Sequence, residues 1–356
     1  MNDLPAPAYR PSFPPGYTPR VGIIGCGNIV RQAHLPAYQK YGVQVAGVYD
    51  AYPPAAQAAQ EQFGIQTVYP SLEALLADPA VDIVDIATFP EQRIPIMRQA
   101  IAAGKHILAQ KPLALDMHEA HAVVQEAERA GLKVAVNQNG RWAPPWRIAT
   151  LLIEQGAIGD VTGILHLFDT NFGWVPGTRF DAIPHWLIYD YSIHWFDITQ
   201  CWLAGQDIRS VRAREYPNLA QPTGSTAAWG MWSEIACAGG ANAMLRCEGG
   251  SRSTQAGHYF WVHGTRGTLR GCVLPERFVE LDDGQNVRAF DFSGSWFPDG
   301  FAGTLGELCW AIVEDRQPYN SARHHLRSLA LTLAACRSAE LDGQPVGLDT
   351  VNFGQA

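Results

Sequence analysis

The chain has 356 residues and an ordinary globular hydrophobic content of 47%, which makes two domains the natural expectation. A formal net charge of -8, spread without long charged blocks, disfavours nucleic acids and anionic membranes as partners. The seven scattered cysteines favour a reducing, cytoplasmic setting, and the sequence has neither an apolar run typical of a membrane span nor a signal peptide.

Residues 1–20 are rich in proline, with Tyr9, Phe13 and Tyr17 between the prolines. Proline at this density prevents helices and central strands and favours an extended arm. A purely disordered tail would not need the aromatic rings, so we expect the arm to dock on a neighbouring surface or subunit. A loose arm is the alternative.

A glycine turn follows the arm. The apolar run 21–24 meets Gly25 and Gly27, and an apolar-periodic helix is predicted over 29–41. This order is typical of a dinucleotide-binding βαβ unit, in which the first glycine permits the turn and the second lets N–H groups approach a pyrophosphate. Val30 replaces the usual third small residue, so the helix should stand slightly farther from the strand. The alternative is a glycine turn of some other α/β protein.

The second predicted strand, 43–49, ends at Asp50, at the spacing where an acidic residue reaches the adenosine ribose hydroxyls. The carboxylate favours NAD over NADP, because a 2′-phosphate beside it would meet like charge with no arginine directly following. An incidental surface aspartate is the alternative.

Strand and helix patterns alternate up to about residue 140. Further buried strands are predicted over 81–88, 105–109 and 133–137. This alternation predicts an α/β domain with a doubly wound parallel sheet over 21–140. Beyond it, strand-like runs with glycine turns predict an α+β domain over 141–356 with a large, mostly antiparallel open sheet.

Lys111 lies just beyond the predicted strand 105–109 and is followed by Pro112, which favours an extended backbone. Open α/β sheets bind ligands at the carboxyl ends of their strands. We therefore expect the Lys111 ammonium to project over the nicotinamide end of the cleft. A surface lysine beside a turn is the alternative.

The segment 187–198 is apolar or aromatic nearly all round, which is typical of a buried helix. On a helix, Asp190, His194 and Asp197 would share one face. Buried ionisable groups are unfavourable without partners, so this face is expected to line a polar pocket. The alternative is an Asp–His pair that only holds the helix.

No metal site is expected. The remaining histidine pairs have the spacing of neighbours on a helix surface, and neither has a third ligand nearby in the sequence. These pairs are His118 with His121 and His324 with His325.

Lys111, Asp190 and His194 together suit hydride transfer. Oxidation of a secondary alcohol sends a hydride to nicotinamide and the hydroxyl proton to a base. A histidine titrates in the required range, whereas a lysine base needs a pKa well below its usual value. We therefore assign His194 as the proton acceptor and Lys111 as a hydrogen-bond donor to the reacting or neighbouring hydroxyl. Asp190 orients His194 or binds a hydroxyl.

These motifs resemble the glucose-fructose oxidoreductase / inositol dehydrogenase / MocA family (Gfo/Idh/MocA) over nearly the whole chain after the arm. Segment 23–29 is similar to its cofactor turn, 102–112 to its Ala-Gly-Lys-His run into Glu-Lys-Pro, and 190–197 to its D-x-G-x-H-x-x-D helix. Segments 264–269 and 338–339 are similar to its later landmarks. The resemblance implies a Rossmann domain that binds NAD and a second domain for substrate binding and oligomerisation. The implied cofactor residues are Gly25, Gly27, Asn28, Ile29, Asp50, Thr88, Gln110 and Lys111.

The sequence departs from the family pattern around the expected site. Gln110 replaces the motif glutamate, Ser192 replaces a glycine, and Arg93 stands where a histidine is common. Phe89-Pro90 alters the loop after Thr88. Lys111 and His194 are retained, so the catalytic interpretation is kept.

The resemblance implies a sugar or polyol as substrate. The aromatic faces of Trp174 and of other tryptophans near the motifs suit the C–H faces of sugar rings, although most are expected in the core or an interface. These others are Trp142, Trp186 and Trp195. Arg179, Asp181 and His185 are candidates to bind hydroxyls or an acidic group. The resemblance also implies a homodimer or homotetramer, with Trp229, Trp232 and Trp261 as candidates for its interface.

Three functions compete at this point. The leading one is NAD-dependent oxidation of a secondary hydroxyl of a sugar, glycoside or cyclitol. The second uses transient oxidation to eliminate or hydrolyse a glycosidic group, with NAD recycled and no net NADH. The third is a sensor that binds NAD(P) without catalysis, which would have no need of Lys111, Asp190 and His194.

Overall fold

The computed structural model describes residues 7–352, which fold into two compact units. The N-terminal unit consists of residues 10–142 and 295–326. The described residues of the C-terminal unit are 7–9, 143–294 and 327–352. Among the described residues, no helix is long and apolar enough to cross a bilayer.

The N-terminal unit is built on a five-stranded sheet in which every neighbouring pair is parallel. The strand order is β2-β1-β3-β4-β5, so the order reverses at β1, and the carboxyl ends of β1 and β3 form the switch point where such sheets bind ligands. This confirms the doubly wound parallel sheet predicted from the sequence. The strands are β1 (Arg20–Ile24), β2 (Gln44–Tyr49), β3 (Ile83–Ile86), β4 (His106–Ala109) and β5 (Val134–Val136).

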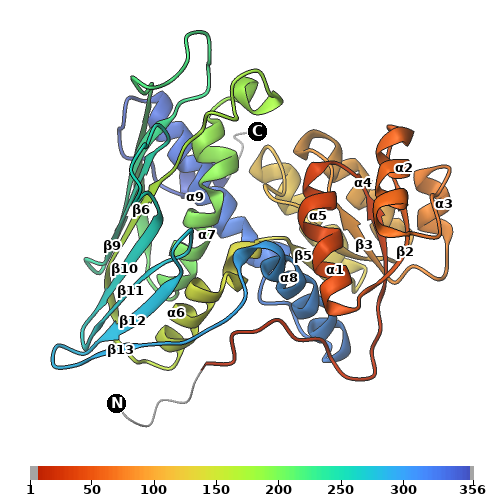
Figure 1. Ribbon diagram of the computed structural model, residues 1–356, viewed down its shortest axis with the longest axis horizontal. Helices are drawn as coiled ribbons and strands as arrows, with labels where there is room; N and C mark the ends of the chain where they lie inside the picture. The colour runs from red at the N-terminus through yellow and green to blue at the C-terminus, as the bar shows by residue number, and fades with distance from the viewer. Residues whose placement is uncertain (1–6, 353–356) are drawn as a thin grey trace. The chain divides into compact units, whose positions relative to one another are not determined.

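Helices cover both faces of this sheet (Figure 1). They are α1 (Leu35–Tyr41), α2 (Pro53–Phe63), α3 (Leu72–Ala77), α4 (Pro90–Ala102), α5 (Met117–Arg129) and α8 (Trp296–Val313), with short turns at η1 (Val30–His34) and η2 (Asn139–Trp142). The helix expected over 29–41 thus begins with the π-helical turn η1. Pro36 explains the widening, because proline has no N–H to continue the α-helical ladder there.

Residues 295–326, which the sequence analysis includes in the C-terminal domain, pack with the N-terminal unit in the structure. The apolar face of α8 explains this difference. Phe301, Leu305 and Leu308 are at most 1% exposed and share one hydrophobic cluster with β1 and the first helix. The burial of this face fixes α8 on the parallel sheet.

The arm docks where the structure describes it. Phe13 and Tyr17 pack against the core cluster of the N-terminal unit, and the Phe13 ring lies 6.2 Å from that of Tyr41. Tyr9 belongs to the C-terminal unit, where its ring packs edge-on against that of Phe292, with 6.3 Å between the ring centroids. The expectation of a docked arm is therefore confirmed for these residues, whereas residues 1–6 lie outside the described part.

The C-terminal unit is built on an eight-stranded sheet of order β13-β12-β11-β10-β6-β9-β8-β7. Only the pair β6 and β9 is parallel among these strands, which confirms the mostly antiparallel sheet. The strands are β6 (Val161–Asp169), β7 (Ile208–Tyr216), β8 (Gly230–Cys237), β9 (Asn242–Glu248), β10 (His258–Gly264), β11 (Thr268–Cys272), β12 (Phe278–Asp282) and β13 (Val287–Ala289).

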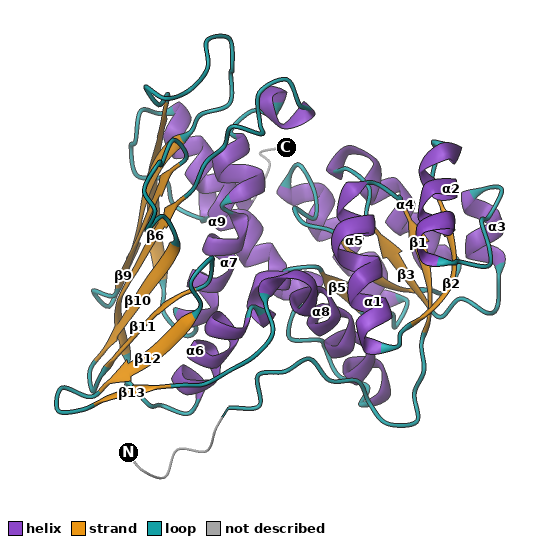
Figure 2. Ribbon diagram, in the orientation of Figure 1, coloured by secondary structure: helices purple, strands orange, loops and turns teal. Residues whose placement is uncertain are grey.

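One face of this sheet is covered by α6, α7 and much of α9 (Figure 2). The helical elements of this part of the chain are α6 (Pro144–Glu154), η3 (Arg179–Ala182), η4 (Leu187–Tyr191), α7 (Ile193–Trp202), α9 (Ala322–Glu340) and α10 (Asp349–Asn352). The opposite face carries the half-buried Trp232 and Trp261. Trp229, also predicted there, precedes β8 and is only 3% exposed, so it belongs to the core instead.

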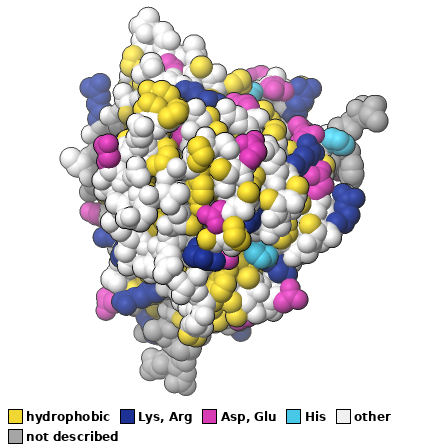
Figure 3. Space-filling view, turned by 90° about the vertical axis from the view of Figure 1, so that its right-hand side faces the viewer, with side chains coloured by type: hydrophobic (Ala, Val, Ile, Leu, Met, Phe, Trp, Pro, Cys, Tyr) yellow, Lys and Arg dark blue, Asp and Glu magenta, His cyan; other side chains and the backbone are white. Residues whose placement is uncertain are grey.

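The charged side chains on the face drawn in Figure 3 are scattered among uncharged ones. Lysine and arginine alternate there with aspartate and glutamate, and no broad patch of one sign is visible.

Candidate active site

The glycine turn after β1 has the geometry expected of a pyrophosphate cradle. Gly25 has φ +93, and a Cβ added there would lie 3.0 Å from the Ala87 backbone, so only glycine fits. At Gly27, by contrast, a Cβ would meet no protein atom within 4 Å. The free space over Gly27, at the start of a helix, is what a bound phosphate needs.

Asp50 lies at the carboxyl end of β2, beside this turn. Its Oδ2 accepts a hydrogen bond from the Cys26 N–H at 2.6 Å, and its Oδ1 accepts one from the Tyr52 N–H at 2.8 Å. Each carboxylate oxygen keeps a lone pair for a ribose hydroxyl. The residues of the turn and Asp50 therefore fit NAD. When bound, NAD supplies the hydride acceptor.

Lys111 follows β4 at the same edge of the sheet. It is half-buried, and its backbone N–H donates to Gln110 Oε1 at 2.9 Å. Arg93, which replaces the common histidine, is 1% exposed and donates to the carbonyl oxygens of Thr88 and Pro112. Arg93 thus ties together the segments that follow β3 and β4, a role that the sequence analysis did not assign to it.

Asp190 and His194 lie on consecutive helical elements of the C-terminal unit rather than on one regular helix. The Ser192 N–H donates to the Leu187 carbonyl at 2.9 Å, which closes the π-helical turn η4 before α7 begins. This extra residue in the turn alters the expected i, i+4 relation of the two side chains. Both are half-buried, in a segment whose other residues are largely buried.

Asp197, expected on the same polar face, is a core residue. It is 1% exposed and accepts a hydrogen bond from Ser328 Oγ of α9 at 2.5 Å. The pair holds α7 against α9, so Asp197 stabilises the helix that carries His194.

Trp174 is the one exposed residue among the four tryptophans considered for the substrate pocket. It is 50% exposed, and its ring packs edge-on against Trp186 at 5.7 Å and Phe180 at 5.5 Å. The other three are at most 6% exposed. Trp142, Trp186 and Trp195 are therefore core residues, which agrees with the expectation that most of these tryptophans lie in the core or an interface.

The remaining candidates for substrate binding differ in their exposure and in their hydrogen bonds to other residues. Arg179 is exposed on η3. Asp181 is half-buried and accepts hydrogen bonds from the Ala227 N–H and Ser225 Oγ, which together with neighbouring bonds lower the pKa of its carboxyl. His185 lies 2.7 Å from a carboxylate oxygen of Glu215, and this hydrogen bond raises its pKa.

Two groups of buried polar residues escaped the sequence analysis. His34 and Asp85 form a buried pair in the N-terminal unit, signalled in the sequence only by an aspartate inside an apolar strand. His325, expected on a helix surface, is fully buried, with its Nδ1 3.2 Å from Gln138 Nε2. No cluster of metal-binding side chains occurs among residues 7–352.

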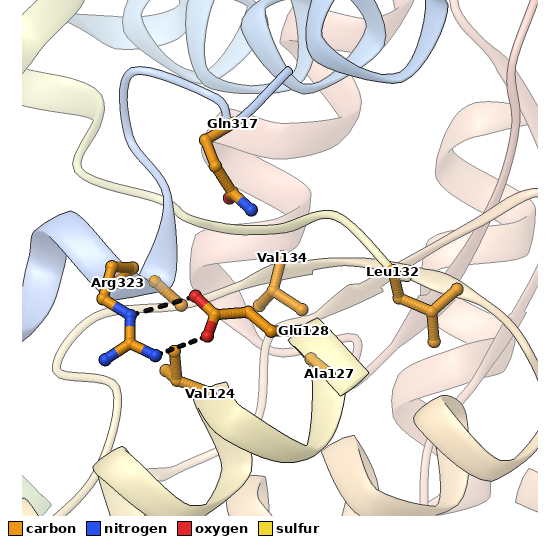
Figure 4. A pocket seen from close by; sticks show the side chains of 8 residues that line it. Val124, Ala127, Glu128, Leu132, Val134, Gln317 and Arg323 are labelled. Carbon is orange, nitrogen blue, oxygen red and sulfur yellow. Dashed lines mark hydrogen bonds and ion pairs between the residues drawn. The ribbon is translucent and has the colours of Figure 1, made fainter. Parts of the chain in front are cut away.

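A small pocket of the N-terminal unit lies between α5 and the start of α9 (Figure 4). Glu128 and Arg323 form an ion pair across it, with Arg323 Nε 2.9 Å from a Glu128 oxygen. None of the predicted site residues lines this pocket, so it is not the candidate active site.

Comparisons with known proteins match both parts of the chain. Residues 19–138 match the model of an oxidoreductase family with an NAD-binding Rossmann fold, and residues 151–348 match its C-terminal alpha/beta domain. The chain is 29% identical over 348 residues to a D-apiose dehydrogenase of Paraburkholderia graminis, covering 92% of this chain and 89% of the relative. It is 24% identical over 327 residues to an inositol 2-dehydrogenase of Rhizobium meliloti, covering 90% and 97%.

A solved structure with the same fold is that of an oxidoreductase from Agrobacterium radiobacter, in complex with NAD+, L-tartaric acid and magnesium. Its TM-score is 0.83 at 23% identity, covering 94% of this chain and 99% of that one. Because the two family models match residues 19–138 and 151–348 in order, the chain belongs to the Gfo/Idh/MocA family of NAD-binding oxidoreductases.

Proposed function

We propose that this protein oxidises a secondary hydroxyl of a sugar, glycoside or cyclitol by hydride transfer to NAD. The observation that carries the proposal is the pair Asp190 and His194, two half-buried ionisable side chains in a largely buried helical segment. The names of the relatives, D-apiose dehydrogenase and inositol 2-dehydrogenase, support a polyhydroxylated substrate.

Each residue of the proposed site has a role that its chemistry allows. His194 accepts the hydroxyl proton, because imidazole is a base near neutral pH. Lys111 donates a hydrogen bond to the reacting or neighbouring hydroxyl, and Asp190 orients His194 or binds a hydroxyl. Trp174 offers an exposed ring face to the C–H groups of the sugar. Arg179 and His185 bind the outer hydroxyls.

The cofactor residues of the proposal lie at the carboxyl edge of the parallel sheet or at the helix that follows β1. Gly27 leaves room for the pyrophosphate, and Asp50 accepts hydrogen bonds from the ribose hydroxyls, which favours NAD over NADP. The Thr88 hydroxyl is buried and has no hydrogen-bond partner in the described part of the chain, so it is available to a bound ligand. The others are Gly25, Asn28, Ile29, Gln110 and Lys111.

The test is a panel of monosaccharides, glycosides, sugar acids and inositols incubated with the purified protein and NAD. Absorbance of NADH and chromatography of the products are both followed. The proposal expects NADH with one class of compound, in an amount equal to the oxidised product. Product without net NADH would indicate redox-assisted elimination or hydrolysis instead. NAD binding without any product would favour a sensor.

We also propose that copies of this chain pair as a dimer or tetramer through the open face of the large sheet. The register aligns Trp261 of β10, Leu165 of β6 and Met244 of β9 across that face. Met244 is 50% exposed, and the other two are half-buried. Burial of such an apolar row favours association.

Light scattering after gel filtration tests this pairing. The proposal expects a dimer or tetramer that Trp261→Glu dissociates, whereas Val287→Glu on the outer strand β13 leaves it intact. A monomeric wild-type protein would contradict the proposal. The expected compartment is the cytoplasm, a proposal supported by the seven free cysteines.

A further inference from the structure

The side chain of Gln110 connects Lys111 to the core of the N-terminal unit. Gln110 is 6% exposed, its Oε1 accepts the Lys111 N–H at 2.9 Å, and its Nε2 lies 2.9 Å from His34 Nε2. A backbone N–H can only donate, so the amide oxygen must face Lys111. The amide NH₂ therefore faces His34 and donates to it.

This orientation determines which nitrogen of His34 carries hydrogen. Because Nε2 accepts from Gln110, and at 3.3 Å also from Asn137 Nδ2, the hydrogen is on Nδ1, which lies 2.6 Å from Asp85 Oδ2. Tyr38 donates to the same oxygen at 2.6 Å. Asp85 and His34 are fully buried, and Tyr38 is 1% exposed, so water does not compete for these bonds.

The hydrogen bonds consequently run in one direction, from the Lys111 N–H through Gln110 and His34 to Asp85. We propose that Gln110 is a positioning residue, which fixes the backbone of Lys111 by anchoring it through this one-directional chain to the Asp85 carboxylate. The inference rests on the proposed function in that Lys111 acts on the substrate.

The direction of these hydrogen bonds explains why glutamine occupies position 110. An ionised glutamate there would present only acceptors, one to the Lys111 N–H and one to His34. His34 would then need hydrogen on Nε2. If Nδ1 lost its hydrogen, two lone pairs would face each other at Asp85. If both nitrogens kept hydrogen, a buried imidazolium would lie between two carboxylates, at a large desolvation penalty.

Reversal of the direction of these hydrogen bonds provides the test. In Gln110→Glu combined with Asp85→Asn, the amide introduced at position 85 can donate to His34 Nδ1, and His34 Nε2–H can donate to the carboxylate introduced at position 110. Only the longer bond from Asn137 Nδ2 to His34 Nε2 is lost. We expect Gln110→Glu alone to lower kcat/KM at least about tenfold and to lower the melting temperature. The double variant should recover at least half of both losses. Gln99→Glu, on the exposed side of α4, is the matched control and should change neither.

Nitrogen NMR of the His34 ring shows directly which of its two nitrogens carries hydrogen. Wild-type protein should give a protonated Nδ1 and an unprotonated Nε2, whereas the double variant should give the reverse. The proposal is overturned if Gln110→Glu melts and turns over like the wild type. It is also overturned if the double variant is no better than Gln110→Glu, or if wild-type Nε2 carries the hydrogen.

The two proposals can fail separately. If the wild type oxidises no compound of the panel, the proposed function fails, but the melting temperatures and the ring-nitrogen signals still test the chain. If turnover is normal but those signals show the opposite tautomer, only the positioning role fails.

Discussion

Two buried histidines should make the C-terminal unit unstable in mild acid. The His166 ring of β6 stacks on Trp202 at 5.5 Å, lies edge-on to Trp146 at 6.1 Å, and has no hydrogen-bond partner for either nitrogen among the described residues. Burial lowers its pKa from 6.5 to about 3. His258, 5.2 Å from the Trp195 ring, has its pKa lowered by burial from 6.5 to about 4.

The sign of the effect follows from proton uptake. The unfolded chain protonates these histidines as the pH falls below about 6.5, while the folded chain keeps them neutral down to about 4 or 3. Acid therefore favours the unfolded state. At about pH 5 the unfolded rings are about 1.5 pH units below their pKa, which removes about 2 kcal/mol per histidine, or about 4 kcal/mol in all.

Urea unfolding followed by tryptophan fluorescence at about pH 7.5 and about pH 5 measures this loss. His166→Phe keeps the ring stack but cannot be protonated, so the variant should lose about 2 kcal/mol less than the wild type on acidification. His118→Phe, at an exposed position of α5, is the control and should behave as the wild type does. An equal acid loss in His166→Phe and the wild type would refute the reasoning.

Four other substitutions probe the cofactor turn, the cofactor preference and the helix that carries His194. Asp50→Ser should bring NADP affinity closer to NAD affinity in a fluorescence titration; unchanged NADP binding would remove Asp50 from the ribose site. Gly25→Ala should lower the free energy of unfolding by about 1–3 kcal/mol, whereas Gly27→Ala should leave stability unchanged and weaken NAD binding. The geometry described for the glycine turn would be contradicted if Gly27→Ala destabilised the protein while Gly25→Ala left its stability unchanged and only weakened NAD binding. Asp197→Ala leaves Ser328 without its buried acceptor and should lower the free energy of unfolding by about 1–3 kcal/mol, measured with urea. An unchanged free energy of unfolding would show that this contact does not stabilise the protein.

The sequence predicted those features that depend on local spacing. The glycine turn at Gly25, the acidic residue at Asp50 and the lysine after β4 follow strands whose apolar runs are easily recognised. In a parallel sheet, the ends of such strands meet at one edge, so their order along the chain was enough to bring these residues together.

Features that depend on distant partners were not predictable in this way. The apolar face of α8 indicates burial but not the sheet that buries it, so the packing of residues 295–326 with the N-terminal unit was not predicted. His325 was placed on a surface because its partner Gln138 is far away in the sequence. The π-helical turns η1 and η4 change the side-chain period by one residue, which a regular helical pattern cannot anticipate.

Isotope transfer tests the central claim most directly. A substrate found by the panel is deuterated at the reacting carbon and incubated with NAD and either wild-type protein or His194→Ala. The account predicts that deuterium appears on the reduced nicotinamide. It also predicts that His194→Ala binds NAD within a few-fold of wild type while its turnover falls at least about a hundredfold. Unlabelled NADH, or a His194→Ala variant that turns over normally, would contradict it.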